Sequence, residues 1–184
     1  LTGVMVENLQ KACESVGFSQ DGYMLQDHSE SFYYYTLCQK PEYWSRSVGW
    51  YAFDQDDVRF RRLTMTSNMK PILVTLEKPV SASLSAEAEE RDKDFYRFIQ
   101  ETLGSGMYSS ILLTGNGFHQ EWAVKSVGLL CKHQRKVFYG NNLFAKGACY
   151  TAKERLEDRE LHRYLYLSDA LVKYNIGMDM MIMG

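Results

Sequence analysis

Close cysteine pairs are absent from this sequence of 184 residues. The four cysteines, Cys13, Cys38, Cys131 and Cys149, lie far apart in apolar or helical contexts. This distribution excludes a disulfide-stapled secreted scaffold and favours reduced thiols. Cys131 has His133 nearby, but no second ligand pair follows at the spacing of a zinc finger. The pair therefore predicts packing and surface residues rather than a metal site.

An excess of charge of one sign is also absent, because the formal net charge is -2 and the sequence pI is about 6.1. This balance gives no electrostatic reason to expect nucleic acid or an anionic membrane surface as a partner. Arg59, Arg61 and Arg62 form a local basic cluster, but no stacking aromatic residues are spaced along a basic groove. We interpret the cluster as a solvated strand edge and predict no nucleic-acid partner.

Long apolar runs and a secretory leader are missing as well. The run from Met178 to Met183 is interrupted by Asp179 and is far shorter than the roughly 20 apolar residues of a membrane span. The chain opens with Leu1-Thr2-Gly3 and a polar, helix-like stretch, which does not resemble a signal peptide. These features predict a cytoplasmic protein with no membrane partner, and the lack of an initiator Met indicates a piece of a longer protein.

The signatures of two large enzyme classes do not occur. No G-x-x-x-x-G-K-[ST] phosphate loop is present, because Lys146-Gly147 lacks the upstream glycine loop. Ser126, Ser168 and the four histidines show neither a nucleophile elbow nor the logic of a catalytic triad. The sequence therefore gives no sign of a P-loop NTPase or a serine hydrolase.

What the sequence does contain is a large apolar share, 45%, and enough alternation to predict an α/β core. Turn and cap residues separate the elements. Helices are predicted at Met5–Val16, Ser29–Gln39, from Ser85 to Leu103, around Trp122–Leu130 and from Asn142 to Lys153, and strands at Tyr23–Leu25, Ser47–Phe53, Val58–Thr66, Ile72–Leu76, Ser110–Thr114 and Lys136–Tyr139. After helical lead-in material, the order β-β-β-α-β-α-β-α predicts a ribonuclease-H-like fold, with a mixed sheet, an antiparallel three-stranded meander and flanking helices.

The composition changes after Tyr150, where the stretch from Lys153 to Arg163 is dense in charge. We therefore expect one domain over residues 1–155, whose first 40 residues are a helical lead-in. Residues 156–184 are expected to form a linker and the start of a further strand-rich segment.

Several segments, in this order, resemble the second lobe of the actin, sugar kinase and heat-shock-chaperone ATPase superfamily. The run Ile111–Phe118 looks like the adenosine motif, in which a hydrophobic strand enters a glycine turn and a helix. Ser47–Arg62 occupies the place of the second phosphate motif, and Gly147–Ala152 resembles the small-residue helix that closes the lobe. Ser168–Met178 is similar to the chaperones' linker and first substrate-domain strand. The resemblance implies an uncharacterised bacterial member of the superfamily.

The resemblance implies a nucleotide site at Gly115, Asn116, Gly117, Phe118 and His119. Phosphate and ribose approach a backbone closely only where no Cβ intrudes, which is why such turns need glycine. Gly115 matches the first glycine of the family pair, Asn116 replaces the second, and Gly117 follows one place late. His119 falls where the chaperones carry an adenine-stacking arginine. The alternative interpretation is a plain strand–turn–helix connection with a surface histidine.

Asp54 is the weak catalytic candidate, since it matches the family Asp that handles metal or water. Gln55, Asp56 and Asp57 follow where glycines are expected, and three carboxylates repel a triphosphate unless a divalent cation intervenes. The alternative is a solvated acidic hairpin turn. The chain from Glu77 to Ser110 is also too short for the chaperone subdomain that walls the adenine site.

These departures predict a degenerate nucleotide-binding-type lobe that acts mainly as a scaffold or protein-interaction module. Its expected partner is another protein or a first lobe that lies outside this chain. The alternative is an active chaperone-like ATPase, with ATP and Mg²⁺ as its cofactors. A third hypothesis is a chaperone-like protein whose substrate-binding β-domain begins near Ser168.

Overall fold

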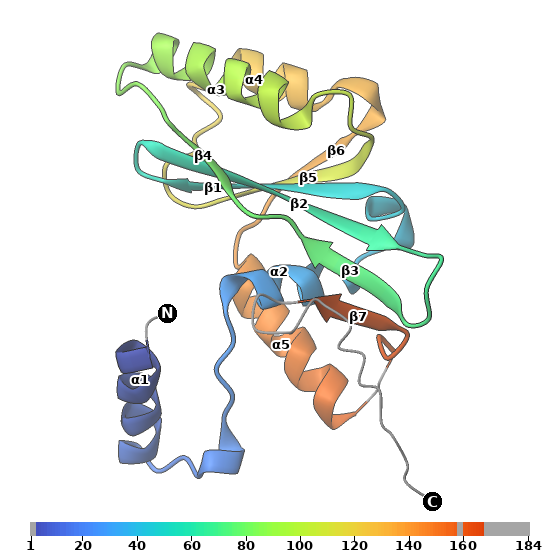
Figure 1. Cartoon of the computed structure of the whole chain (residues 1–184). Helices are drawn as coiled ribbons and strands as arrows, with labels where there is room; N and C mark the ends of the chain where they lie inside the picture. The colour runs from blue at the N-terminus through green and yellow to red at the C-terminus, as the bar shows by residue number, and fades with distance from the viewer. Residues whose placement is uncertain (1–2, 158–159, 168–184) are drawn as a thin grey trace, which may run out of the picture.

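A computed structural model describes residues 3–157 and 160–167. A seven-stranded mixed sheet forms the centre, with helices on both of its faces (Figure 1). Helices α3 (Ala88–Leu103) and α4 (Val124–Leu130) cover one face, and α2 (His28–Leu37) and α5 (Leu143–Leu156) cover the other. The predicted mixed α/β fold is therefore confirmed.

The main path of the sheet runs β6-β5-β1-β2-β3-β7, and β4 pairs with β2 beside this path. Strands β1 (Ser47–Asp54), β2 (Asp57–Thr66) and β3 (Ile72–Leu76) form the predicted antiparallel meander. Strands β5 (Tyr108–Thr114) and β6 (Lys136–Tyr139) then run parallel to β1. The predicted order of strands and helices is confirmed over these elements.

Alternation along β1 separates two cores, because successive side chains of a strand point to opposite faces. Val48 and Trp50 are buried against α2 and α5, whereas Tyr51 and Phe53 are buried against α3 and α4. Buried aromatic rings dominate both layers, which explains why a chain of this length encloses a core on each side of its sheet.

Four local predictions are wrong. Residues 23–25 are not a strand; the 3₁₀ turn Gln20–Gly22 and extended chain lead into α2. Asp27, not Ser29, caps α2, its carboxylate accepting from the Glu30 amide at 2.7 Å. Glu87 rather than Ser85 caps α3. Strand β4 (Val80–Ser83) was not predicted, because four mostly exposed residues are too few for their alternation to identify a strand.

Strand β7 (Tyr164–Leu167) pairs in parallel with β3, so these four residues belong to the same sheet as the rest of the domain. The expected division at residue 156 stays a prediction. The chaperone-like segment from Ser168 onward lies outside the described residues.

Helix α1 (Gly3–Ser15) stands apart from the layered body in Figure 1 and buries none of its residues. Its predicted amphipathic stripe is present, but Met5 and Leu9 are 51% and 43% exposed. Within the described part of the chain, no helix is both long and apolar enough to cross a bilayer.

Candidate functional site

The predicted adenosine turn follows β5, but it does not enter a helix directly. Residues 115–123 form a loop, and α4 begins only at Val124. The expectation that Trp122 lies on the following helix is therefore wrong. Phe118, only 8% exposed, packs on Phe53 and Trp122 with ring-centroid distances of 5.1 and 5.5 Å. Burial of these rings stabilises the loop conformation, and the segment does not form a helical turn.

The two glycines of the loop are needed for contact with this chain's own backbone. Gly115 has a φ of +97°, and a Cβ there would overlap the carbonyl of Phe53. A Cβ on Gly117 would overlap the backbone of Gln55, in the β1–β2 turn. The backbone of the β1–β2 hairpin thus lies directly against both loop glycines, on the side to which a Cβ would point. Asn116 and His119 are exposed, and the structure brings neither into a binding pocket among the described residues.

The N-terminus of α4 is occupied by an internal carboxylate. Asp92 of α3 is 6% exposed and accepts hydrogen bonds from the amides of Lys125 and Ser126 at 2.9 and 3.0 Å. The Ser126 hydroxyl adds a third bond at 2.6 Å. A helix N-terminus attracts anions through its free amides and its dipole. Here Asp92 already supplies that anion, so these amides are not available to a phosphate.

Asp54 and Gly115 do lie together, in a cleft of about 460 Å³ where β1 and β5 end. Arg59 and Arg61 of β2 line the same cleft from the neighbouring strand. Ligands of open α/β sheets bind at the carboxyl ends of parallel strands, so this cleft is the candidate functional site.

Aromatic side chains form the inner wall of the cleft. Trp50 donates from Nε1 to the Thr114 hydroxyl at 2.8 Å and meets the ring of Phe144 edge to face, with centroids 5.8 Å apart. His28, at the start of α2, stacks on Phe144 with a centroid distance of 3.9 Å. These contacts come from four elements and fix the shape of the cleft before any ligand enters.

The charged groups of the cleft are mostly engaged. Arg61 donates from Nε to the Glu77 carbonyl at 2.8 Å and from Nη1 to the Ser29 hydroxyl at 2.5 Å. Arg59 lies 3.9 Å from Asp54, both side chains being more than half exposed. Such a pair is worth little in water. Among the described residues that line the cleft, Asp54 is the single carboxylate.

Asp56 and Asp57 have structural partners in the hairpin turn. Arg91 of α3 donates to Asp56 at 2.8 Å, and the Ser83 hydroxyl donates to Asp57 at 2.7 Å. Over residues 3–157 and 160–167, no three His, Cys, Asp or Glu side chains are grouped so as to hold a metal ion. Mg²⁺ is usually held by one or two carboxylates together with water and phosphate oxygens, and Asp54 is the one carboxylate among the described residues that line the cleft.

Asp92 is the residue that sequence reasoning missed. It stands in a charged stretch of α3, Glu89–Lys93, where a carboxylate normally predicts a solvated face. One signal was available: no good N-cap residue precedes Val124, so α4 needed a cap from elsewhere. Only the packing of α3 on α4 identifies Asp92 as that cap.

A family profile described as the C-terminal part of a family of unknown function, DUF5716, matches residues 1–169. The chain belongs to this family. The description names no actin-like or chaperone ATPase. A search among curated proteins gives no match.

Solved structures give distant similarities. The RuvC structure of Thermus thermophilus has 12% identity and a TM-score of 0.39, covering 50% of this chain and 60% of its own. The structure of T. thermophilus RuvC in complex with a Holliday junction substrate has 11% identity and a TM-score of 0.37, covering 50% of this chain and 65% of its own. The chain thus spans less than two thirds of both. The yeast mitochondrial Holliday junction resolvase Ydc2 has 10% identity and a TM-score of 0.40, covering 89% of this chain and 80% of its own. Similarity this distant does not bear on what the present chain binds.

Proposed function

We propose that this domain is a non-catalytic, degenerate nucleotide-binding-type lobe of the ribonuclease-H-like class, kin to the actin and chaperone ATPases, that works as a protein-interaction module. The observation that carries the proposal is Asp92, whose buried carboxylate bonds the first amides of α4. A phosphate at this helix would have to displace a side chain that belongs to the fold. We further propose that the domain binds no nucleic acid.

The loop glycines support the same conclusion. Gly115 and Gly117 lie against the hairpin backbone, so their missing side chains serve internal packing. A turn whose glycines serve internal packing does not by that pattern indicate a cradle for phosphate.

Helix α1 supports the interaction half of the proposal. Val4, Met5 and Leu9 of α1 are 67%, 51% and 43% exposed. A helix of this length is marginally stable alone in water, and its stability comes from packing an apolar face. We propose that a protein surface covers this face, with the preceding part of a longer parent protein as the partner.

Calorimetric titration of the chain with Mg-ATP tests the non-catalytic half. The expected result is no saturable heat up to millimolar nucleotide and no phosphate release. Micromolar binding with turnover would overturn the proposal. Titration of the parent protein, measured in parallel, distinguishes a site completed by a first lobe from a site that is absent.

Hydrogen exchange tests the interaction half. The amides of α1 should exchange rapidly in this chain and become protected in the parent protein. A Leu9→Glu variant of the parent should lose that protection, whereas Glu7→Gln, on the polar side of the helix, should retain it. Rapid exchange of α1 in the unmodified parent would contradict the proposed partner.

One observation favours a second function, an active ATPase. Asp54 and Gly115 line one cleft together with Arg59 and Arg61, as a site for an anionic ligand requires. If this function is correct, Asp54→Ala in the parent protein abolishes ATP hydrolysis. Unchanged turnover would remove Asp54 from the mechanism.

A further inference from the structure

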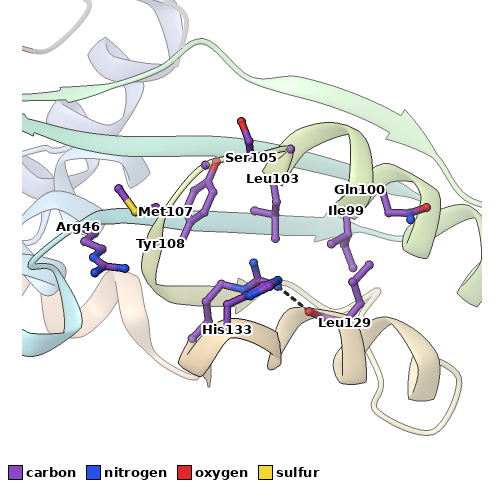
Figure 2. A pocket seen from close by; sticks show the side chains of 12 residues that line it. Arg46, Ile99, Gln100, Leu103, Ser105, Met107, Tyr108, Leu129 and His133 are labelled. Carbon is purple, nitrogen blue, oxygen red and sulfur yellow. Dashed lines mark hydrogen bonds between the residues drawn. The ribbon is translucent and has the colours of Figure 1, made fainter.

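A second and larger cavity, of about 680 Å³, opens at the other end of the sheet and on its other face (Figure 2). It lies where β1 and β5 begin, between the C-terminal end of α3, the glycine loop after it and the end of α4. Its volume is in the range of pockets that hold small organic ligands. Neither the sequence patterns nor the cleft at the carboxyl ends of the strands accounts for it.

The charges around this cavity have one sign. Arg46, His133 and Arg135 line it, and no Asp or Glu is present among the described residues that do so. The whole chain has a formal net charge of -2, so this local excess of basic groups is not a consequence of overall composition. A concave site lined by one sign of charge concentrates ligands of the opposite sign.

Arg135 is held in place by two hydrogen bonds, and its guanidinium group keeps further donors that could bind a ligand. Its Nε donates to the Leu130 carbonyl at 2.8 Å and its Nη2 to the Leu129 carbonyl at 2.6 Å, both at the end of α4. Its remaining amino group, Nη1, bonds to no described residue, and no described carboxylate pairs with the guanidinium. The side chain is half-buried, and burial lowers the pKa of Arg135. Buried charges are usually paired with a charge of opposite sign. Arg135 has no such partner among the described residues.

Arg46 is positioned from the other side. Its backbone amide donates to the Ser109 hydroxyl at 2.7 Å, which fixes the start of β1 against β5. Figure 2 shows Arg46 on the left of the pocket and the aliphatic side chains of Ile99, Leu103 and Leu129 on the right. The cavity therefore combines cationic groups with an apolar wall.

We propose that this cavity binds a small organic oxyanion, whose phosphate or carboxylate group is held by Arg135, with the exposed Arg46 adding positive charge at the rim, and whose apolar body packs on Leu103 and Leu129. Guanidinium groups suit both head groups, because their fork of N–H donors matches two oxygens. This proposal does not depend on the proposed function, since the cavity lies at the opposite end of the sheet from Asp54 and Gly115.

Titration of the intact chain with benzoate, phenyl phosphate, inorganic phosphate and benzyl alcohol, followed by calorimetry and by the NMR signal of Arg135 Nε–H, tests the proposal. At least one aromatic anion should bind saturably, about tenfold or more tighter than benzyl alcohol, because a charge-assisted hydrogen bond is worth at least that factor. The tighter of benzoate and phenyl phosphate identifies the head group, and inorganic phosphate shows what the apolar wall adds.

Matched arginine variants locate the binding. Arg46→Gln removes an exposed side chain without disturbing the core, and Arg135→Lys keeps the charge but loses the fork. Arg135→Lys should weaken binding about tenfold and Arg46→Gln by less, whereas Arg59→Gln, at the other end of the sheet, should leave it unchanged. The proposal is overturned if neither aromatic anion binds, if benzyl alcohol binds equally well, or if Arg59→Gln weakens binding as much as Arg46→Gln.

Discussion

Helix α4 has two ends, and both are capped by side chains from outside the helix. At its N-terminus, Asp92 accepts three hydrogen bonds from Lys125 and Ser126 and is nearly inaccessible to solvent. At its C-terminus, Arg135 donates to the Leu129 and Leu130 carbonyls. Each charge has the sign that the helix dipole favours.

The two caps differ in whether they keep hydrogen-bonding groups without a partner. Asp92 is saturated by its partners, whereas Arg135 keeps an unused amino group that borders a cavity. The closed end of α4 is therefore the one where Asp92 bonds the helix amides, and the open end is the one where Arg135 keeps a donor that borders a cavity. A motif resemblance thus identified a place in the fold, but not which place has unused binding capacity.

The largest effect is expected for Gly115→Ala, at the closed end. The new Cβ would overlap the Phe53 carbonyl, and backbone cannot move aside as a flexible side chain can. We expect a loss of about 3 to 5 kcal/mol in the free energy of unfolding, measured in urea. Gly104→Ala, at a φ of +47° and a ψ of -133° with open space around it, is the control for backbone strain without a clash and should cost about 1 to 3 kcal/mol. Equal losses would show that the loop does not pack on the hairpin.

Removal of the Asp92 cap is expected to cost about 3 kcal/mol, because Asp92→Ala leaves the amides of Lys125 and Ser126 unpaired in a buried place. Urea unfolding gives the magnitude, and hydrogen exchange at these two amides shows its location. A loss under about 1 kcal/mol would mean that water replaces the carboxylate, and the argument against phosphate at this helix would fail.

The corresponding change at the open end, Arg135→Ala, should cost less, about 1 to 2 kcal/mol, because the Leu129 and Leu130 carbonyls lie nearer to solvent. Arg59→Ala, whose ion pair is exposed, is the matched control and should change stability by no more than about 0.5 kcal/mol. If Arg135→Ala lowers the free energy of unfolding more than Asp92→Ala does, Arg135 rather than Asp92 is the cap more fully engaged by the fold, which contradicts the comparison.

Acid should weaken the closed end through Asp94. The Ser85 amide and hydroxyl donate to this carboxylate at 3.1 and 2.6 Å and hold the pKa of Asp94 below its ordinary value of 3.8. A folded-state pKa below the unfolded one contributes stability above pH 3.8, which is lost as pH falls through the folded value. The Asp94→Asn variant should therefore be less stable than the unmodified chain by about 0.5 kcal/mol at neutral pH. This difference in the free energy of unfolding, the gap, should disappear in acid. A gap independent of pH would contradict this assignment.

The smallest effect is expected for Asp54→Ala. The Asp54 side chain is 75% exposed and its ion pair with Arg59 is long, so unfolding should change by less than about 0.5 kcal/mol. Thermal unfolding with and without Mg-ATP checks both the stability and the proposed absence of nucleotide binding. A stabilisation by Mg-ATP that disappears in the variant would favour the ATPase alternative.

Sequence patterns were sufficient for most of the elements and insufficient for the details of the site. The apolar alternation of β1 and β2 and the aromatic stripe of α3 correctly predicted strands and helix, because local periodicity reflects which face is buried. The strand predicted at residues 23–25 and the missed β4 are short segments in which alternation carries little information. The motif at Gly115 predicted a turn in which no Cβ intrudes, and the structure places the hairpin backbone against that glycine, while nucleotide binding there stays a prediction.

By itself the sequence determined the layered α/β architecture, since the period of its apolar residues fixes the secondary structure and the faces to be buried. It also determined that no close cysteine pairs or phosphate loop are present. Only the tertiary structure decided which charges are satisfied. Asp92 and Arg135 are ordinary surface residues by sequence, and their roles arise because α3, α4 and β6 come together across distances that local patterns do not encode.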